Sequence, residues 1–474
     1  MVFSSTIFLF VFLPFTLLGY YLINPRFRNV FLLMVSLFFY AWGEPKFVFV
    51  MIFSIFMNYL FGLFVDKYRD NKKRAYFIIF LTVAFNVTLF FIFKYLNFTI
   101  RNLNLLFDDA IPQTNIALPI GISFFTFQAM SYVFDIYRQN GEVQKNPLNV
   151  ALYVSFFPQL IAGPIVRYET VCNDIKNRKE TFQDFVYGIK RFTIGMGKKV
   201  IISNSIAVVA EKAYAYTDYS ELSVGFAWMG AIAYSLQILF DFSGYSDMAI
   251  GLGRMFGFHF VENFDYPYIS KSVSEFWRRW HISLGTWFRD YVYFPLGGSR
   301  VKSKSRLILN LFAVWTLTGV WHGASWNFIL WGIFYFVLLT FEKLTGIPKR
   351  FKSKLTQNIY RVFTLLSVMF GWVFFNAKDL SQGVNYVKAM FGAQHNALIG
   401  VAEHFWFDKT ILIYIIAIIL CTPVAKKISG LAQRNKACEC VLSILEPVMF
   451  LMLFVLCIAY MVTSTYNPFI YFNF

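Results

Sequence analysis

The stretch LILNLFAVWTLTGVWHGASWNFILWGIFYFVLLTFE, residues 307–342, decides the fold of this chain. It is almost entirely apolar, and the segments on either side, 271–306 and 343–354, contain 8 and 5 lysines and arginines. Because basic loops favour the cytoplasmic side of a membrane, the stretch is expected to enter the membrane and return. A helix from the basic segment to His322 reaches about 24 Å, less than the roughly 30 Å of the hydrocarbon core. The sequence therefore predicts a hairpin whose turn, near 318–323, lies deep in the membrane or near its outer edge.

The composition of the whole chain is also that of a membrane protein. Hydrophobic residues make up 58% of the 474 residues and charged residues 15%, against about 45–50% and about 25% in soluble proteins. A soluble fold cannot cover so much apolar surface with so few charged side chains. Apolar runs of spanning length, together with weaker or interrupted runs, predict about 10–13 membrane segments. We expect an all-α, polytopic, multi-pass protein of the plasma (inner) membrane that forms a single domain over residues 1–474.

Lysine and arginine are distributed unevenly, which predicts the orientation of the chain. Six connections hold 32 of the 43 basic residues and are expected to be cytoplasmic. These connections are 24–28, 66–74, 167–199, 271–306, 343–354 and 426–436. The segment 377–408 has few basic residues and is expected outside. The net charge of +17 is then explained by loops that face anionic membrane lipid, and no nucleic-acid partner is expected.

His322 is an ionisable residue at the predicted turn inside the membrane. Such a residue is costly there, so a functional role is a reasonable hypothesis, although a neutral structural histidine bonded to a neighbouring helix is an equally good interpretation. Gly319 and Gly323 are expected to leave room for a substrate beside the ring. Trp321 is a candidate wall of a substrate cavity, and Asn327 is a candidate hydrogen-bond donor to an oxyanion.

A second polar cluster lies in the predicted cytoplasmic segment 264–300. On a continuous helix, five of its residues share one stripe, which predicts an amphipathic helix at the membrane surface. They are Trp277, His281, Leu284, Phe288 and Tyr291. His281 is unusual in such an apolar stripe. Arg278 and Arg279 point elsewhere and are candidates to bind the phosphates of a donor, although lipid headgroups are the favoured partner.

A third cluster, in residues 239–257, is interpreted as structural. Asp247 and Arg254 are seven residues apart, so they share a helical face and are expected to pair with each other. Gly251, Gly253 and Gly257 are expected to permit close contact with another helix. The five cysteines show neither the spacing of a zinc site nor a disulfide framework, so neither a metal nor a resident cofactor is expected.

Five long motifs together resemble the membrane-bound O-acyltransferase family. Within it, they are most similar to the bacterial branch of polysaccharide O-acetyltransferases, which includes the membrane subunit of the alginate O-acetylation machinery. The motifs are ALPIGISFFTFQAMSYVFDIYR, SFFPQLIAGPIVRY, LFDFSGYSDMAIGLGRMFGF, WRRWHISLGTWFRDYVYFPLGGSR and TGVWHGASWNFILWG. The resemblance implies that His322 is the catalytic histidine and that His281 is a second functional histidine. It also implies a ring of helices around a central tunnel that joins a cytoplasmic donor to an external acceptor.

The resemblance implies a particular reaction and particular partners. The acyl group, expected to be acetyl, comes from acetyl-CoA or an acyl-carrier thioester and goes to an extracytoplasmic polysaccharide with the help of a separate, esterase-like extracytoplasmic protein. A neutral imidazole suits a general base, because its ordinary pKa is about 6.5. We therefore expect His322 to act as the base or as a transient acyl acceptor. His281 is expected to orient the thioester or polarise its carbonyl.

Three other interpretations remain open at this point. One, within the enzyme class, is D-alanyl transfer from a carrier protein to teichoic acid. Another, from a different class, is a transporter or flippase of a cell-surface polymer, which would move its cargo without consuming a thioester. The third is a scaffold without chemistry of its own, in which the loss of His322 would leave the product unchanged.

Overall fold

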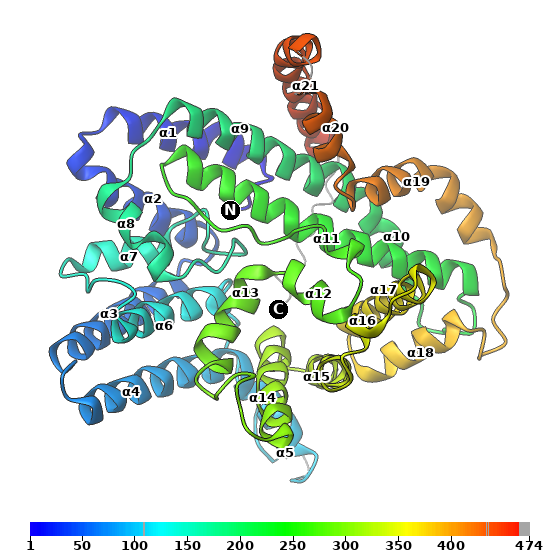
Figure 1. Ribbon diagram of the computed structural model, residues 1–474, viewed down its shortest axis with the longest axis horizontal. Helices are drawn as coiled ribbons and strands as arrows, with labels where there is room; N and C mark the ends of the chain where they lie inside the picture. Colours follow the sequence, from blue (N-terminus) through cyan, green and yellow to red (C-terminus); the bar gives the residue numbers. More distant parts are fainter. Residues whose placement is uncertain (108–109, 433, 435, 464–474) are drawn as a thin grey trace. The chain divides into compact units, whose positions relative to one another are not determined.

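The computed structural model describes residues 1–107, 110–432, 434 and 436–463, and these residues form helices and no strands (Figure 1). The all-α prediction is confirmed for this part of the chain. The chain divides into two compact units: unit 1 comprises residues 1–192 and 246–261, and unit 2 comprises 193–245 and the residues from 262 onward. The expectation of one domain over the whole chain stays a prediction.

Unit 1 is built from the helices before residue 192 and from the end of one later helix. Its elements are η1 (Phe8–Phe12), α1 (Leu13–Leu22), η2 (Pro25–Phe27), α2 (Arg28–Gly43), α3 (Phe47–Lys67), α4 (Lys72–Phe90), η3 (Phe91–Tyr95), α5 (Leu96–Asn104), α6 (Ile122–Arg138), α7 (Pro147–Ser155), α8 (Tyr168–Asn177), most of α9 (Phe182–Gly197) and the end of α11 (Val224–Met255). Helix α3 packs against α6 and α4 (Figure 1).

The predicted ion pair between Asp247 and Arg254 is wrong, because α9 lies beside this part of α11 and supplies both partners. Arg191 of α9 contacts Asp247 at 2.7 Å, and Asp184 of α9 contacts Arg254 at 2.7 Å. The predicted close helix contact at Gly251 is confirmed, since a Cβ atom there would lie 2.6 Å from a backbone oxygen of α9. The two cross-helix ion pairs therefore flank the point where the backbones meet.

Unit 2 contains both histidines of the sequence prediction. Its elements are η4 (Lys198–Ser203), α10 (Asn204–Tyr214), most of α11, η5 (Pro267–Ile269), α12 (Val273–Arg279), α13 (Ile282–Phe288), η6 (Arg289–Tyr293), α14 (Lys304–His322), α15 (Trp326–Thr345), α16 (Ile347–Arg350), α17 (Lys354–Asn376), α18 (Leu380–Met390), α19 (Val401–Leu420), α20 (Val424–Ala432) and α21 (Lys436–Thr463).

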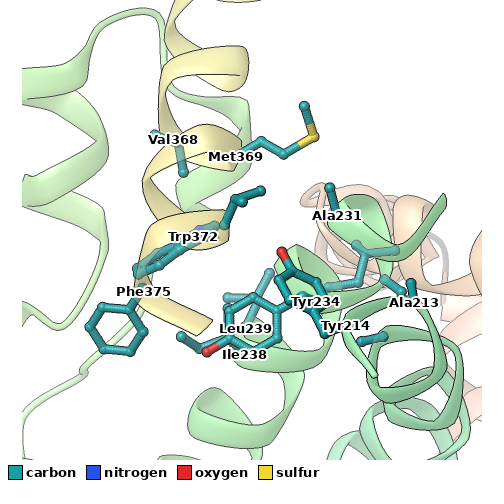
Figure 2. Packing of buried hydrophobic residues seen from close by; sticks show 14 of the residues in the cluster. Ala213, Tyr214, Ala231, Tyr234, Ile238, Leu239, Val368, Met369, Trp372 and Phe375 are labelled. Atoms are coloured by element: carbon teal, nitrogen blue, oxygen red, sulfur yellow. The ribbon is translucent and has the colours of Figure 1, made fainter. Parts of the chain in front are cut away.

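The core of unit 2 is a continuous cluster of buried side chains that is rich in aromatic rings. Trp372 of α17 packs on Trp280 with ring centroids 4.7 Å apart. Figure 2 shows part of this core, with Val368 and Trp372 from α17 and with Tyr214 and Tyr234 from α10 and α11. A buried ion pair, Lys199 to Asp241 at 2.6 Å, joins η4 to α11. This core fixes α17 relative to the helices that carry the candidate site.

Seven helical segments of the described chain are long and apolar enough to cross a membrane. An eighth, bent by 65°, is formed by α19 and α20 together. This is fewer than the 10–13 membrane segments predicted, because that number included re-entrant and interfacial helices, and expected segments such as 29–43 and 149–166 form helices too short to span. The expected orientation stays a prediction, as does the central tunnel.

The predicted hairpin in residues 307–342 is confirmed. Helix α14 ends at His322, and α15 begins at Trp326 after a turn of three residues. The two helices approach closely because Gly319 and Gly332 have no side chain at the crossing. A Cβ atom would lie 2.5 Å from the Phe328 oxygen at Gly319 and 2.4 Å from the Trp315 oxygen at Gly332. The two glycines therefore set the spacing of the hairpin.

Candidate active site

The segment around His281 is two short helices and not the single amphipathic helix predicted. Helix α12 ends at Arg279 and α13 begins at Ile282, and His281 between them has φ 46°. This left-handed conformation is uncommon for a residue with a side chain and costs about 1–3 kcal/mol. Four of the five residues of the predicted stripe nevertheless line one cavity; Tyr291 does not. The break turns the stripe into a concave surface.

The hydrogen bonds of His281 define its tautomer. Its Nδ1 lies 3.1 Å from the side-chain oxygen of Asn263, and the same oxygen accepts from the backbone N–H and the hydroxyl of Ser283. The Asn263 oxygen can only accept, so Nδ1 of His281 carries the proton and donates it. Burial lowers the pKa of His281 to about 3, so the ring is neutral at physiological pH. Its Nε2 then presents a lone pair and cannot polarise a carbonyl.

His281 faces a cavity of about 380 Å³ between α12, α13, α14 and α15, which we call the α12–α15 cavity. Its walls are mainly apolar and aromatic. Within the described part of the chain, two buried polar atoms that belong to lining residues have no hydrogen-bond partner. They are Nε2 of His281, an acceptor, and Nε1 of Trp277, a donor. The cavity therefore offers one donor and one acceptor to a bound molecule, as expected of a ligand site.

The rim of the α12–α15 cavity is basic. Arg278 and Lys343 are exposed and line it, as does Arg289, which is paired with Asp290 at 2.8 Å. Arg279 is not part of this rim, since its guanidinium is bonded to Asp265 at 2.8 Å and to Glu275 at 3.0 Å. Of the two arginines predicted to bind a donor, the structure places only Arg278 at the cavity.

His322, at the end of α14, lies in an aromatic environment and is buried. Its ring centroid is 4.9 Å from that of Trp321, 5.1 Å from that of Trp331 and 5.1 Å from that of Phe375. Trp321 also lies 6.1 Å from the ring of His281. The structure thus brings the two predicted histidines to the same tryptophan, although 40 residues separate them in the sequence.

Gly319 and Gly323 do not provide the space for substrate that was predicted. At Gly319 the space is occupied by the Phe328 carbonyl, and at Gly323 a Cβ atom would lie 2.2 Å from the Phe328 ring. Both glycines therefore admit α15 and not a ligand.

Asn327 is not suited to the predicted role of an oxyanion donor. Its Nδ2 donates to the backbone oxygens of Ala377 at 2.7 Å and Phe374 at 3.3 Å. These two bonds use both N–H groups of the amide. Asn327 instead ties the start of α15 to the end of α17.

Glu342 is a site residue that the sequence prediction missed. It is 4% exposed, and its carboxylate accepts from the backbone N–H groups of Val273 and Ser274, at 2.7 and 2.8 Å, and from the hydroxyl of Tyr360 at 2.9 Å. One side chain at the end of α15 therefore holds the start of α12 and the side of α17. The sequence feature that could have revealed Glu342 is an acidic residue directly before a basic loop.

Comparison with known proteins agrees with the motifs. The family model for membrane-bound O-acyltransferases matches residues 34–380. The chain is 43% identical over 398 residues to the protein named probable alginate O-acetylase AlgI of Pseudomonas putida, covering 82% of this chain and 80% of that protein. It is 35% identical over 427 residues to the peptidoglycan O-acetyltransferase of Helicobacter pylori, covering 83% and 80%. It is 33% identical over 282 residues to the teichoic acid D-alanyltransferase of Bacillus subtilis, covering 56% and 71%.

Proposed function

Because the chain belongs to the membrane-bound O-acyltransferase family, we propose that it transfers an acetyl group from a cytoplasmic thioester to a hydroxyl group, for the O-acetylation of an extracytoplasmic polysaccharide. The chain is an integral membrane O-acyltransferase with O-acetylating relatives. What we propose beyond this is the identity of the acyl group and of the donor, the direction of transfer and the role of each residue.

Acetyl is favoured over D-alanyl by the extent of the similarity. The relatives named for O-acetylation match about four fifths of this chain. The relative named for D-alanyl transfer matches 56% of it. D-alanyl transfer to teichoic acid is therefore the second candidate, and the two differ in the donor, because D-alanine would arrive on a carrier protein.

The α12–α15 cavity suits the arm of a thioester donor. Acetyl-CoA and acyl-carrier proteins share a phosphopantetheine arm, which has a phosphate at one end, amides along its length and the thioester at the other end. Arg278 and Lys343 on the rim would bind the phosphate. Trp277 Nε1 and His281 Nε2 would bond a carbonyl and an N–H group of the arm. His281 therefore has the first of its two predicted roles, to orient the donor.

His322 is the general base of the proposed reaction. As the acceptor oxygen attacks the thioester carbon, an imidazole nitrogen of His322 takes the hydroxyl proton. The tetrahedral intermediate then collapses, the C–S bond breaks, and the proton passes to the leaving thiolate. The products are an O-acetyl ester and a free thiol, so atoms and charge balance. The aromatic walls around His322 exclude water, which limits hydrolysis of the thioester.

The acceptor side is expected to need a second protein. The basic rim of the α12–α15 cavity lies in segments predicted to be cytoplasmic, whereas 377–408, beside the other end of α15, is predicted to be outside. The relatives' names point to polymers outside the cytoplasm as acceptors. We propose that a separate, esterase-like extracytoplasmic protein places the acetyl group on the polymer.

The observation that carries the proposal is the meeting of His281 and His322 at Trp321, next to a cavity with a basic rim. The test is to supply the purified chain, in lipid nanodiscs, with acetyl-CoA or an acetylated carrier protein and to measure free thiol. Release of thiol that depends on an added hydroxyl acceptor is expected. Movement of a polymer across sealed vesicles with no thiol released would instead establish the transporter interpretation.

A further inference from the structure

A second cavity in unit 2 is lined by Trp331, whose ring lies 5.4 Å from that of Trp277 in the α12–α15 cavity. It has a volume of about 170 Å³ and is formed by α15, α17 and α18; we call it the α15–α17 cavity. Asn327, Trp331 and Gly371 are among its lining residues, and exposed Leu330 and Leu380 lie at its rim. Among the residues that the structure describes, no charged side chain lines it.

One face of α15 carries three polar groups, of which the first two belong to residues that line this cavity. Asn327, Trp331 and Tyr335 are spaced four residues apart, so they form one line along the helix. Their exposed fractions are 2%, 2% and 0%. In the described residues, Oδ1 of Asn327, Nε1 of Trp331 and the hydroxyl of Tyr335 each lack a hydrogen-bond partner.

The Tyr335 hydroxyl packs against Gly371, which lines the cavity. A Cβ atom at position 371 would lie 2.3 Å from the hydroxyl oxygen, so only a glycine leaves room for this oxygen. An acceptor, a donor and a group that is both therefore follow one another along α15. Buried polar groups are nearly always paired, so two unpaired groups on lining residues, with a third beside Gly371, favour a polar occupant.

The same line of residues leads to the proposed base. The Trp331 ring lies 5.1 Å from the His322 ring and 5.4 Å from the Trp277 ring. Trp331 therefore stands between the α15–α17 cavity, the base and the wall of the α12–α15 cavity. The end of α15 that carries Asn327 is tied to Ala377, at the start of the segment predicted to be outside.

We propose that the α15–α17 cavity binds the acceptor as an aliphatic hydroxyl group, with Asn327, Trp331 and Tyr335 as its hydrogen-bond partners. This inference rests on the proposed function and adds the location and chemistry of the acceptor site. The uncharged lining suits a neutral hydroxyl and not a phosphate or a carboxylate. Its volume of about 170 Å³ is below the roughly 300–1,000 Å³ of sites that enclose drug-sized ligands, so it suits one hydroxyl-bearing group and not a polymer chain.

The hydroxyl has two plausible sources, which the experiment separates. One is a sugar of the polysaccharide, and the other is a serine side chain of the partner protein. The probes are a hexuronate oligosaccharide and N-acetylserine amide, each supplied with acetyl-CoA to purified protein in nanodiscs. Transfer to either probe, and competition of either probe with thioester hydrolysis, are measured.

The variants remove one hydrogen-bonding group and keep an aromatic side chain: Tyr335→Phe loses only the hydroxyl, and Trp331→Phe replaces the indole by a smaller ring without an N–H. Trp331→Phe and Tyr335→Phe are each expected to raise KM for the hydroxyl probe roughly three- to tenfold, the effect of one lost hydrogen bond. KM for acetyl-CoA is expected to change less than KM for the hydroxyl probe, because neither residue lines the α12–α15 cavity. Trp277→Phe is expected to raise KM for acetyl-CoA and to leave KM for the hydroxyl probe nearly unchanged. Trp42→Phe, an exposed tryptophan of unit 1, is the matched control and is expected to change neither constant.

Each outcome is informative. A rise in KM for one probe alone supports the site and identifies the source of the hydroxyl. Normal thiol release with an unchanged probe KM in both α15 variants would overturn the acceptor site and leave the proposed function intact. Wild-type protein that neither acetylates either probe nor is inhibited by it would also overturn the acceptor site. Absence of thiol release from wild type under all conditions would instead contradict the proposed function itself.

Discussion

The two cavities of unit 2 are built from the same helix, α15, but they differ in charge. The α12–α15 cavity has Arg278 and Lys343 on its rim and aromatic rings inside. In the described part of the chain, no charged residue lines the α15–α17 cavity, and two of its lining residues, Asn327 and Trp331, carry neutral polar groups without a partner. Trp331 lies between them and beside His322. This difference is what we would expect if, as proposed, a phosphate-bearing thioester binds on one side of His322 and a neutral hydroxyl group on the other.

The two cavities also differ in how they are held. The α12–α15 cavity depends on a short helix, α12, whose start is fixed by Glu342. The α15–α17 cavity lies between longer helices that Asn327 ties together. Loss of the Glu342 contacts should therefore impair use of the donor much more than use of the acceptor. This difference allows the two sites to be distinguished experimentally.

Glu342→Ala is expected to have the largest effect after loss of the base itself. Without the carboxylate, the two N–H groups at the start of α12 lose their partner, and Trp277 and His281 shift relative to His322. A displacement of about 1 Å in a catalytic arrangement can cost about 10²-fold, so kcat/KM for acetyl-CoA is expected to fall about that much. Steady-state kinetics on monodisperse protein provide the measurement.

The matched variant for Glu342 is Tyr360→Phe, which removes only one of its three bonds and is expected to have a much smaller effect. If Glu342→Ala instead changed the KM of the hydroxyl acceptor and left that of the donor untouched, the assignment of the two cavities would be reversed.

The double variant Arg278→Gln and Lys343→Gln tests the charge difference. Both side chains are exposed and would bind the donor phosphate, so KM for acetyl-CoA is expected to rise about three- to tenfold at low salt. The difference in KM for acetyl-CoA between variant and wild type should become smaller as salt is added, because exposed charges are screened. The KM of the hydroxyl probe should not change. An effect that is independent of salt would show that the two cations do not act through their charge.

A smaller effect is expected of pH on the stability of the folded protein. The folded protein holds His281 with a pKa of about 3, below the ordinary value of about 6.5. As the pH falls below about 6.5, the unfolded chain takes up a proton that the folded protein refuses. The contribution of neutral His281 to stability is therefore complete above about pH 6.5 and is lost progressively toward about pH 3. Melting midpoints at a fixed scan rate should fall more steeply with acid in wild type than in His281→Gln, and equal slopes would contradict this.

Much of the candidate site could be predicted from the sequence, because its signals are local. A long apolar stretch between two basic segments, interrupted by a Gly-rich turn, predicted the hairpin and placed His322 at its tip. The aromatic stripe around His281 predicted which side chains face one surface. The line of Asn327, Trp331 and Tyr335 was also visible as a spacing of four, but nothing local distinguished it from ordinary packing.

What could not be predicted depends on contacts between distant segments. The helix break at His281 is accompanied by its hydrogen bond to Asn263, 18 residues upstream. Asp247 and Arg254 had a suitable partner in each other, and only the position of α9 shows that each pairs elsewhere. Gly319 and Gly323 were expected to make space, yet that space is filled by α15. In each case the helical periodicity of the sequence predicts on which face of a helix a residue lies, but not which other segment packs against that face.

The most direct test of the central claim is acetyl transfer by His322→Ala, measured on purified protein with acetyl-CoA binding determined in parallel. His404→Ala, an exposed histidine of α19, is the matched control. If His322 is the base between the two cavities, transfer should fall about 10²–10⁴-fold, while acetyl-CoA binding and the melting midpoint stay close to wild type. Wild-type transfer by His322→Ala would contradict the account, and loss of acetyl-CoA binding with intact chemistry would mean that His322 serves the donor site instead.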